Sequence, residues 1–108
     1  MSVPQNGAHR DVLETLLVHC WESALRQRPI DVHDDFFALA GHSLVAMRIA
    51  HRLEKALGVP VEYVLVLEHP TIAELARSLR DSGVPASELE RAGREYLLTL
   101  GVPVPDPT

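Results

Sequence analysis

One stretch of the sequence differs from the helical patterns on either side of it: Asp34-Asp35-Phe36-Phe37-Ala38-Leu39-Ala40-Gly41-His42-Ser43-Leu44. It combines two acids, both phenylalanines of the chain, a glycine and a serine that opens a helical pattern. A serine at that position lies beside the unpaired backbone N–H groups of the first turn, at the positive end of the helix dipole. The stretch therefore predicts a place on the protein that favours a phosphate or a phosphodiester.

Two kinds of residue in this stretch predict different roles. We expect Phe36, Phe37 and Leu39 to anchor it in a helical bundle, and the run from Gly41 to Ser43 to be exposed to solvent. An alternative interpretation is that the serine is an ordinary helix N-cap, a position that serine favours. A serine hydrolase is not indicated, because the nucleophile elbow needs a second glycine where Val45 stands and a strand before the serine.

Helical periodicity dominates the remainder of the chain. One apolar stripe follows the predicted N-cap Asp11, with a glutamate three residues after the cap, and its pattern stops before Pro29. A second helical pattern runs from Ser43 to Gly58, and a third begins at a capping box that opens on Thr71. These three substantial helices indicate an all-α protein.

Two further segments complete the predicted fold. Residues 61–67 have the composition of a strand, but a lone strand would have no partner, so we interpret them as a loop that leads into a short helical turn. A last helix is predicted from a capping box at Ser87 to a stop at Gly101. Its apolar stripe consists of Leu89, Ala92, Tyr96, Leu97 and Leu100. The predicted fold class is an all-α four-helix bundle whose third helix is short, with an additional C-terminal helix.

Length and composition limit the chain to one small globular domain. It has 108 residues, of which 46% are hydrophobic and 23% are charged, as is usual for a folded protein. We expect residues 1–10 to form a flexible N-terminus and residues 11–81 to form the bundle. Residues 87–100 are the additional helix, and residues 101–108 are predicted to be a flexible tail.

Charge and residue content exclude several classes of protein. The 10 basic and 15 acidic residues give a net charge of −5, which argues against nucleic acid as a partner. Cys20 is the only cysteine, so no intramolecular disulfide exists, and its place on an apolar stripe predicts a buried, inert thiol. No apolar run is long enough for a membrane span and no signal segment is visible, which predicts a cytoplasmic protein without membrane partners. The six histidines show no metal-ligand spacing, so no metal site is predicted.

The stretch from Asp34 to Leu44 resembles the signature of thiolation domains, the peptidyl carrier proteins of nonribosomal peptide synthetases. In that family an aspartate, paired aromatics, a leucine and a Gly-Gly-x-Ser-Leu run lead into the second helix of a four-helix bundle. Downstream, Gly58-Val59 and Leu67-Glu68-His69-Pro70-Thr71-Ile72-Ala73-Glu74-Leu75-Ala76 are similar to the family's helix junctions. The resemblance covers residues 12–79 and requires no gap.

The resemblance implies a non-catalytic carrier. Ser43 would be the residue to which a phosphopantetheinyl transferase attaches 4′-phosphopantetheine from coenzyme A. Gly41, His42 and Leu44 would flank this cofactor site. The terminal thiol of the arm would carry an aminoacyl or peptidyl group as a thioester. The transferase would supply the metal and the base, which explains why no catalytic residue is found beside the serine.

The resemblance also implies partner enzymes, namely the transferase, an adenylation enzyme, and condensation or tailoring enzymes. The residues expected to contact them are Leu44, Met47, Val64 and Leu65. We expect the C-terminal helix to fold back on its own bundle and the protein to be a monomer. A dimer through that helix, or docking of that helix to a partner enzyme, are alternatives. The sequence identifies neither the amino acid carried nor the pathway, and it fits a free-standing carrier or a domain of a larger synthetase.

Two departures from the family pattern bear on this interpretation. Ala40 replaces the first glycine, which costs about 1 kcal/mol if that position needs a positive φ. The second helix has Arg48, Arg52 and Lys55 against the single acid Glu54, whereas fatty-acid carriers present an acidic second helix. This charge favours a peptidyl carrier. An acyl carrier protein of a polyketide pathway is the alternative within the class, and a small helical interaction protein without a prosthetic group is the alternative outside it.

Overall fold

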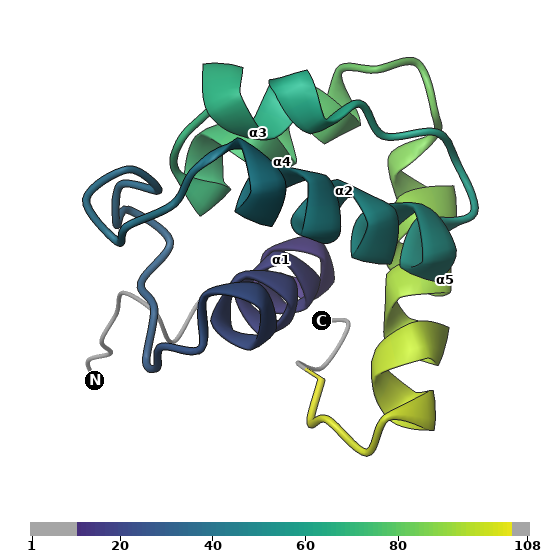
Figure 1. The fold of residues 1–108 in the computed structure, drawn as a ribbon. Coiled ribbons are helices and arrows are strands. Elements are labelled where there is room, and N and C mark those ends of the chain that lie inside the picture. The colour runs from purple at the N-terminus through teal and green to yellow at the C-terminus, as the bar shows by residue number, and fades with distance from the viewer. Residues whose placement is uncertain (1–10, 105–108) are drawn as a thin grey trace, which may run out of the picture.

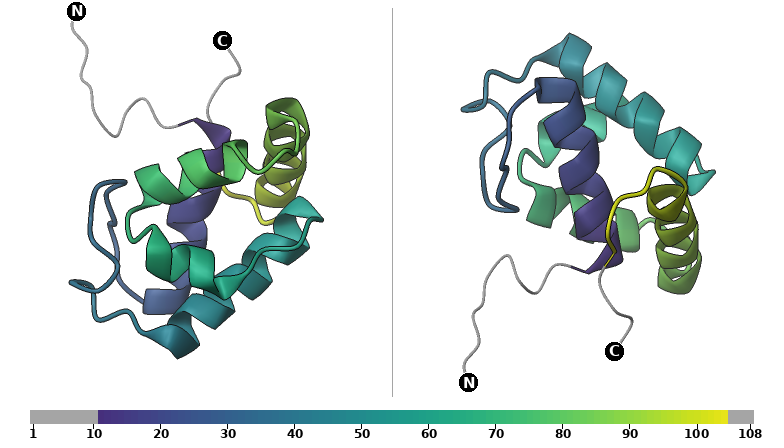
Figure 2. Two further views of the ribbon diagram at one scale, coloured as in Figure 1. Left: turned by 90° about the horizontal axis from the view of Figure 1, so that it is seen from above. Right: turned by 90° about the horizontal axis from the view of Figure 1, so that it is seen from below.

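The computed structural model describes residues 11–104, which form five α-helices and no strand. The helices are α1 (Val12–Leu25), α2 (Ser43–Leu57), α3 (Tyr63–Glu68), α4 (Ile72–Arg80) and α5 (Ala86–Thr99). Figures 1 and 2 show α1 in the middle of the bundle, with the long loop between α1 and α2 at the opposite side from α5. The all-α prediction is confirmed, and the predicted flexible segments 1–10 and 105–108 lie outside the described residues.

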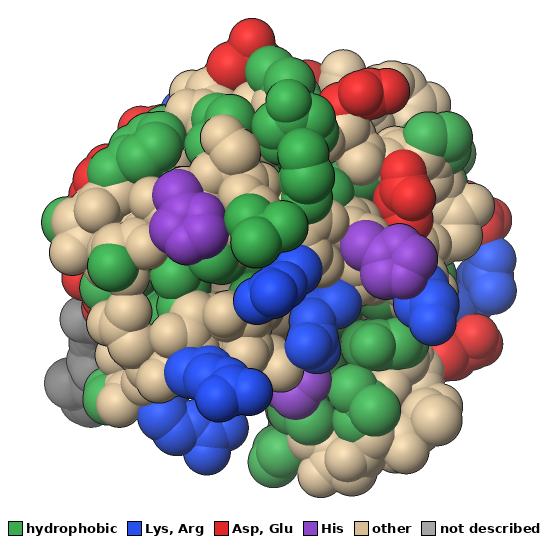
Figure 3. All heavy atoms as spheres, viewed as in Figure 1, with side chains coloured by type: hydrophobic (Ala, Val, Ile, Leu, Met, Phe, Trp, Pro, Cys, Tyr) green, Lys and Arg blue, Asp and Glu red, His purple; other side chains and the backbone are tan. Residues whose placement is uncertain are grey.

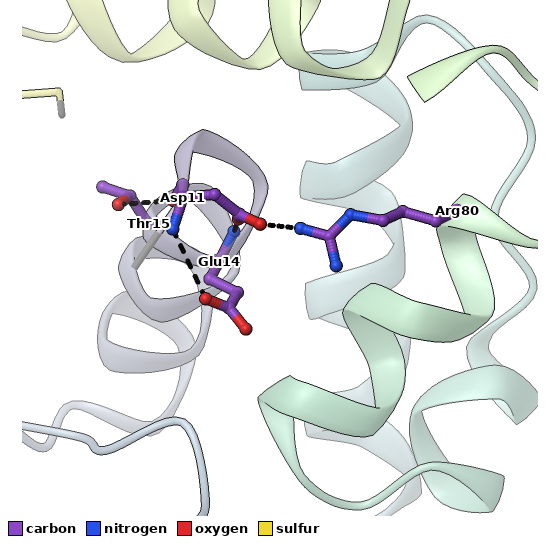
Figure 4. Close-up of polar contacts among 4 residues, drawn as sticks. All are labelled: Asp11, Glu14, Thr15 and Arg80. Atoms are coloured by element: carbon purple, nitrogen blue, oxygen red, sulfur yellow. Dashed lines mark hydrogen bonds and ion pairs between the residues drawn. The ribbon is translucent and has the colours of Figure 1, made fainter. Parts of the chain in front are cut away.

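The start of α1 is fixed by the predicted capping box. The Asp11 carboxylate accepts a hydrogen bond from the Glu14 backbone N–H at 2.8 Å, and the Glu14 carboxylate accepts one from the Asp11 N–H at 3.4 Å (Figure 4). The Arg80 guanidinium at the end of α4 forms an ion pair with the same Asp11 carboxylate. One aspartate therefore caps α1 and ties it to α4, which packs against it.

The core forms where α1 meets the loop that follows it. Trp21 on α1 and Phe36 in the loop are fully buried, and their ring centroids lie 5.3 Å apart in an edge-to-face arrangement. Around this pair the core is aliphatic, and the helices α2, α4 and α5 all contact α1. The loop is thus part of the core rather than a simple connection between helices.

The strand-like segment of the sequence forms α3, a helix of six residues, as the interpretation of a short helical turn predicts. Val66 is its buried residue, and α3 packs against α2 and α4. A side chain from the preceding helix stabilises the entry to this segment, because the Glu54 carboxylate accepts a hydrogen bond from the Val61 N–H at 2.8 Å. The bundle therefore has the short third helix that the sequence predicts.

The additional helix α5 packs on the bundle, against α1 and α2. Leu89 and Leu97 are buried, whereas Leu100, which the sequence places on the apolar stripe, is exposed. The predicted capping box at Ser87 is wrong, because α5 begins at Ala86 with Pro85 as its N-cap and without a side-chain cap. In the first part of the segment predicted to be a flexible tail, the side chains of Val102 and Val104 pack against the core.

Gly93→Ala is expected to stabilise the protein by about 0.5–1 kcal/mol, because alanine is the better helix former. A Cβ atom on Gly93 would lie 3.5 Å from the Leu16 Cδ2 atom and 3.6 Å from the Val12 Cγ1 atom, which are ordinary van der Waals distances. Urea unfolding measures the effect. Ala92→Gly on the same helix is the matched control, and its free energy of unfolding should fall by a similar amount. A destabilised Gly93→Ala protein would show that α5 lies closer to α1 than these distances indicate.

Candidate functional site

Backbone hydrogen bonds hold the loop between α1 and α2 against the junction of α3 and α4. The Phe36 N–H donates to the Pro70 carbonyl at 2.6 Å, and the Ala73 N–H at the start of α4 donates to the Val32 carbonyl at 3.0 Å. Within the loop, the Asp35 carboxylate accepts a hydrogen bond from the Ala38 N–H at 2.9 Å. Sequence reasoning did not find the Phe36–Pro70 and Ala73–Val32 contacts, because these join segments that lie more than thirty residues apart.

Only one of the two adjacent phenylalanines anchors the loop. Phe36 is fully buried, whereas Phe37 is 50% exposed, so the prediction that both enter the core is wrong for Phe37. Leu39 is half-buried and packs against the core as expected. The Phe37 ring still contacts the Phe36 ring edge to face, with centroids 5.5 Å apart. Phe37 therefore leaves an aromatic face on the surface of the loop before α2.

Gly41 lies directly against the buried Phe36 ring. Its N–H donates to the Phe36 carbonyl at 2.9 Å, and a Cβ atom placed on Gly41 would come within 2.5 Å of the Cε2 and Cζ atoms of that ring. Ala40, the preceding residue, has a φ of +69°, so the conformational cost expected for alanine at this position is present. The loop thus needs glycine at position 41 for space and favours it at position 40 for backbone conformation.

Gly41→Ala is expected to lower the free energy of unfolding by about 1–3 kcal/mol, because the Phe36 ring is packed on Trp21 and cannot move aside without strain. The displaced loop should also slow modification of the serine that follows it. Gly58→Ala is the matched control, since Gly58 has a φ of +73° and open space around its Cβ position. The free energy of unfolding of the Gly58→Ala variant should fall by about 1–2 kcal/mol, while Ser43 is modified at the normal rate. Equal modification rates for the two variants would contradict this role of Gly41.

Ser43 is exposed as the first residue of α2. The interpretation of Ser43 as the N-cap is wrong, because His42 is the N-cap, in an extended conformation and with no side-chain hydrogen bond to the first turn. The first turn of this 15-residue helix also contains no acidic residue. Uncapped N–H groups and the positive end of the helix dipole therefore surround the hydroxyl, which is a suitable environment for a phosphodiester.

Three exposed apolar side chains, Leu44, Met47 and Val64, lie on α2 and α3, and Leu44 directly follows Ser43; together they are called the apolar surface below. Leu44 and Met47 are three residues apart on α2 and so lie on one face of it, and Val64 belongs to α3, which packs against α2. Met47 is 46% exposed, which excludes a role in the core. Leu65, predicted with this group, is half-buried instead and lines a hollow between α3 and α4.

The only cysteine, Cys20, is buried in the core on α1. Burial raises the pKa of its thiol to about 12, against the opposing effect of the Arg52 charge. In residues 11–104 no three histidine, cysteine or acidic side chains are grouped so as to hold a metal ion. No helix in this described part of the chain is long and apolar enough to cross a membrane.

A family model described as the phosphopantetheine attachment site matches residues 15–79, which is more than half of the chain. The chain belongs to this family of carrier domains, whose prosthetic group is 4′-phosphopantetheine. The match begins within α1 and ends within α4, so it covers the loop, Ser43 and the apolar surface and does not include α5.

Several known proteins similar to this chain are nonribosomal peptide synthetases or their subunits. This chain is 42% identical over 74 residues to surfactin synthase subunit 3 of Bacillus subtilis (strain 168). The aligned residues cover 68% of this chain but only 6% of that relative. The fold matches the nonribosomal peptide synthetase FmoA3 with a TM-score of 0.69 and 28% identity, over 77% of this chain and 9% of that one. It also matches the complex of the phosphopantetheine transferase Sfp with coenzyme A and a peptidyl carrier protein, with a TM-score of 0.59 and 29% identity, over 73% of this chain and 96% of the matched chain.

Proposed function

We propose that this protein carries aminoacyl or peptidyl intermediates of nonribosomal peptide synthesis, with Ser43 as the residue that bears 4′-phosphopantetheine. The single observation that carries the assignment is the exposed Ser43 hydroxyl at the uncapped N-terminus of α2, inside the region that matches the phosphopantetheine attachment family. When attached, this group supplies a terminal thiol that holds the carried acid as a thioester.

The residues of the chain have three tasks at this site. Ser43 provides the oxygen for the phosphodiester, and the backbone N–H groups of the first turn of α2 face the negative charge that this bond brings. Gly41 lets the loop pass over Phe36 and so fixes where Ser43 lies. No hydrogen bond joins the Ser43 hydroxyl to a base within residues 11–104, so activation of the hydroxyl belongs to a partner enzyme. The chain thus acts as a substrate and a carrier in this proposal rather than as a catalyst.

The partners in this proposal are a phosphopantetheinyl transferase, an adenylation enzyme, and condensation or tailoring enzymes. Support comes from the solved complex of Sfp with a carrier protein and from the synthetase FmoA3, both of similar fold. The apolar surface of Leu44, Met47 and Val64 is where such enzymes would contact the chain. Exposed apolar side chains next to a reactive group are typical of a protein–protein contact.

Incubation of the chain with coenzyme A and a phosphopantetheinyl transferase tests the proposal directly. Intact-mass spectrometry should show the gain of one 4′-phosphopantetheine, and fragmentation should place it on Ser43. The modified protein is then offered aminoacyl and malonyl donors through their loading enzymes. Loading by aminoacyl donors is expected, whereas exclusive loading by malonyl donors would assign the chain to a polyketide pathway instead. No mass gain at all would reject the carrier function.

Met47→Glu is expected to impair recognition by the transferase or by a condensation enzyme, while the melting temperature changes by less than about 2 °C. The side chain is exposed, so a charge there disrupts an apolar contact with a partner without entering the core. Leu98→Glu on α5 is the matched control, because Leu98 is also exposed but lies outside the proposed contact surface. Modification kinetics and circular dichroism distinguish the outcomes, and equal rates for both variants would contradict the assignment of Met47.

A further inference from the structure

A groove between α2 and α5 has a strongly basic lining. It has a volume of about 450 Å³ and is lined by Met47, Arg48, His51, Arg52, Lys55 and Tyr96. The lining contains three permanent cations and no carboxylate. Figure 3 shows Lys and Arg side chains gathered across the face that α2 forms, next to hydrophobic side chains. The groove exists because α5 packs against α2, and it runs along α2 from Met47, one turn after Ser43, to Lys55 near the end of the helix.

No ion pair within residues 11–104 involves the cations of this groove. These cations are Arg48, Arg52 and Lys55, and the ion pairs of the described chain involve other arginines. The only acid of α2, Glu54, is not in the groove lining, and its carboxylate accepts a hydrogen bond from the Val61 N–H. Three cations therefore share one surface of a protein whose net charge is −5.

The shape and charge of the groove identify the kind of partner that fits. Met47 and Tyr96 offer apolar contact, and the cations around them offer ion pairs, so a segment with an apolar residue flanked by acids is complementary to both. A nucleic acid fits less well, because the net charge of −5 repels a phosphate backbone outside these few side chains. The same repulsion holds an acidic protein away from other faces and so orients its approach.

We propose that the groove between α2 and α5 is a docking site for an acidic segment of a partner protein. This inference goes beyond attachment of the arm and does not depend on Ser43, which is not among the groove residues, although the groove shares Met47 with the apolar surface proposed to contact the modifying enzymes. Part of the site is Tyr96 of α5, which lies outside the region that the family model matches. The site therefore belongs to this chain with its additional helix and not to the four-helix unit alone.

The test uses the full chain and two labelled synthetic peptides. One carries glutamates around a single leucine, and the other has glutamine in place of every glutamate. Fluorescence anisotropy at low salt should show binding of the acidic peptide, and the affinity should fall as salt screens the charges. Arg48→Gln/Lys55→Gln should weaken this binding about tenfold, because two exposed ion pairs are removed. The matched control Arg28→Gln/Arg77→Gln has the same change in net charge and should weaken it less than about twofold.

Several outcomes would overturn the proposal. These are equal binding of the two peptides, equal losses in the two double variants, and tighter binding of a short DNA duplex than of the acidic peptide. Amide chemical shifts should map the peptide to α2 and α5, and circular dichroism checks that each variant is folded. The experiment is repeated with Ser43→Ala protein. Because that variant cannot bear the 4′-phosphopantetheine arm, unchanged peptide binding would show that the docking site acts independently of the carrier function.

Discussion

Ser43→Ala is expected to abolish the mass gain of 4′-phosphopantetheine completely, because the hydroxyl oxygen that forms the phosphodiester is removed. The fold should be unaffected. Ser43 is exposed and does not cap α2, so its replacement should change the free energy of unfolding by less than about 0.5 kcal/mol. Intact-mass spectrometry and thermal unfolding measure the two quantities separately.

Ser87→Ala is the matched control for this prediction. Ser87 is also an exposed serine in the first turn of a helix, α5, but it lacks the loop that precedes Ser43. Its replacement should leave modification unchanged. A mass gain that persists in Ser43→Ala protein would show that another residue bears the arm, and unfolding of that variant would show that the hydroxyl has a structural role.

Ending the chain after Gly83 is expected to lower the melting temperature by more than about 10 °C at every protein concentration. The truncation removes α5, whose buried Leu89 and Leu97 side chains cover α1, and each buried leucine is worth about 1.5–3 kcal/mol. Sedimentation should show no change of oligomeric state between the two chains. If the full chain were a dimer held by α5, the truncated chain would sediment as a monomer, and the stability of the full chain would depend on concentration.

Two neighbouring leucines on α5 refine this prediction. Leu97 is fully buried and Leu98 is 58% exposed. Leu97→Ala should therefore lower the free energy of unfolding by about 2–5 kcal/mol, whereas Leu98→Ala should lower it by less than about 0.5 kcal/mol. Similar small losses in both variants would mean that α5 contributes little to the bundle in solution.

Features that depend on a few neighbouring residues were predicted well from the sequence. The capping box of Asp11 and Glu14 involves residues three apart, and it is present as predicted. The end of α2 at Gly58 is also correct, since a left-handed residue ends a helix regardless of the remainder of the fold. The same local argument was wrong at Ser87, because Pro85 and Ala86 already start the helix and leave the serine inside its first turn.

Features that depend on packing between distant segments were predicted less well. A Phe-Phe pair carries no periodicity, so the sequence cannot show that Phe36 enters the core and Phe37 does not. The sequence also does not show that Leu65 lines a hollow between α3 and α4, and its predicted contact with partner enzymes stays a prediction. The groove between α2 and α5 could not be predicted either, because it requires knowing where the additional helix packs.

The buried state of Cys20 has a consequence for how the carrier can be followed in solution. Its thiol is enclosed in the core and stays protonated at neutral pH, since its pKa lies near 12. Alkylating reagents need an accessible thiolate, so the folded protein without an arm does not react with them. Because the chain has a single cysteine, every reactive sulfur in a folded sample belongs to a 4′-phosphopantetheine arm that bears no acyl group. A thiol titration of the native protein therefore counts vacant arms, and loading appears as the disappearance of that signal.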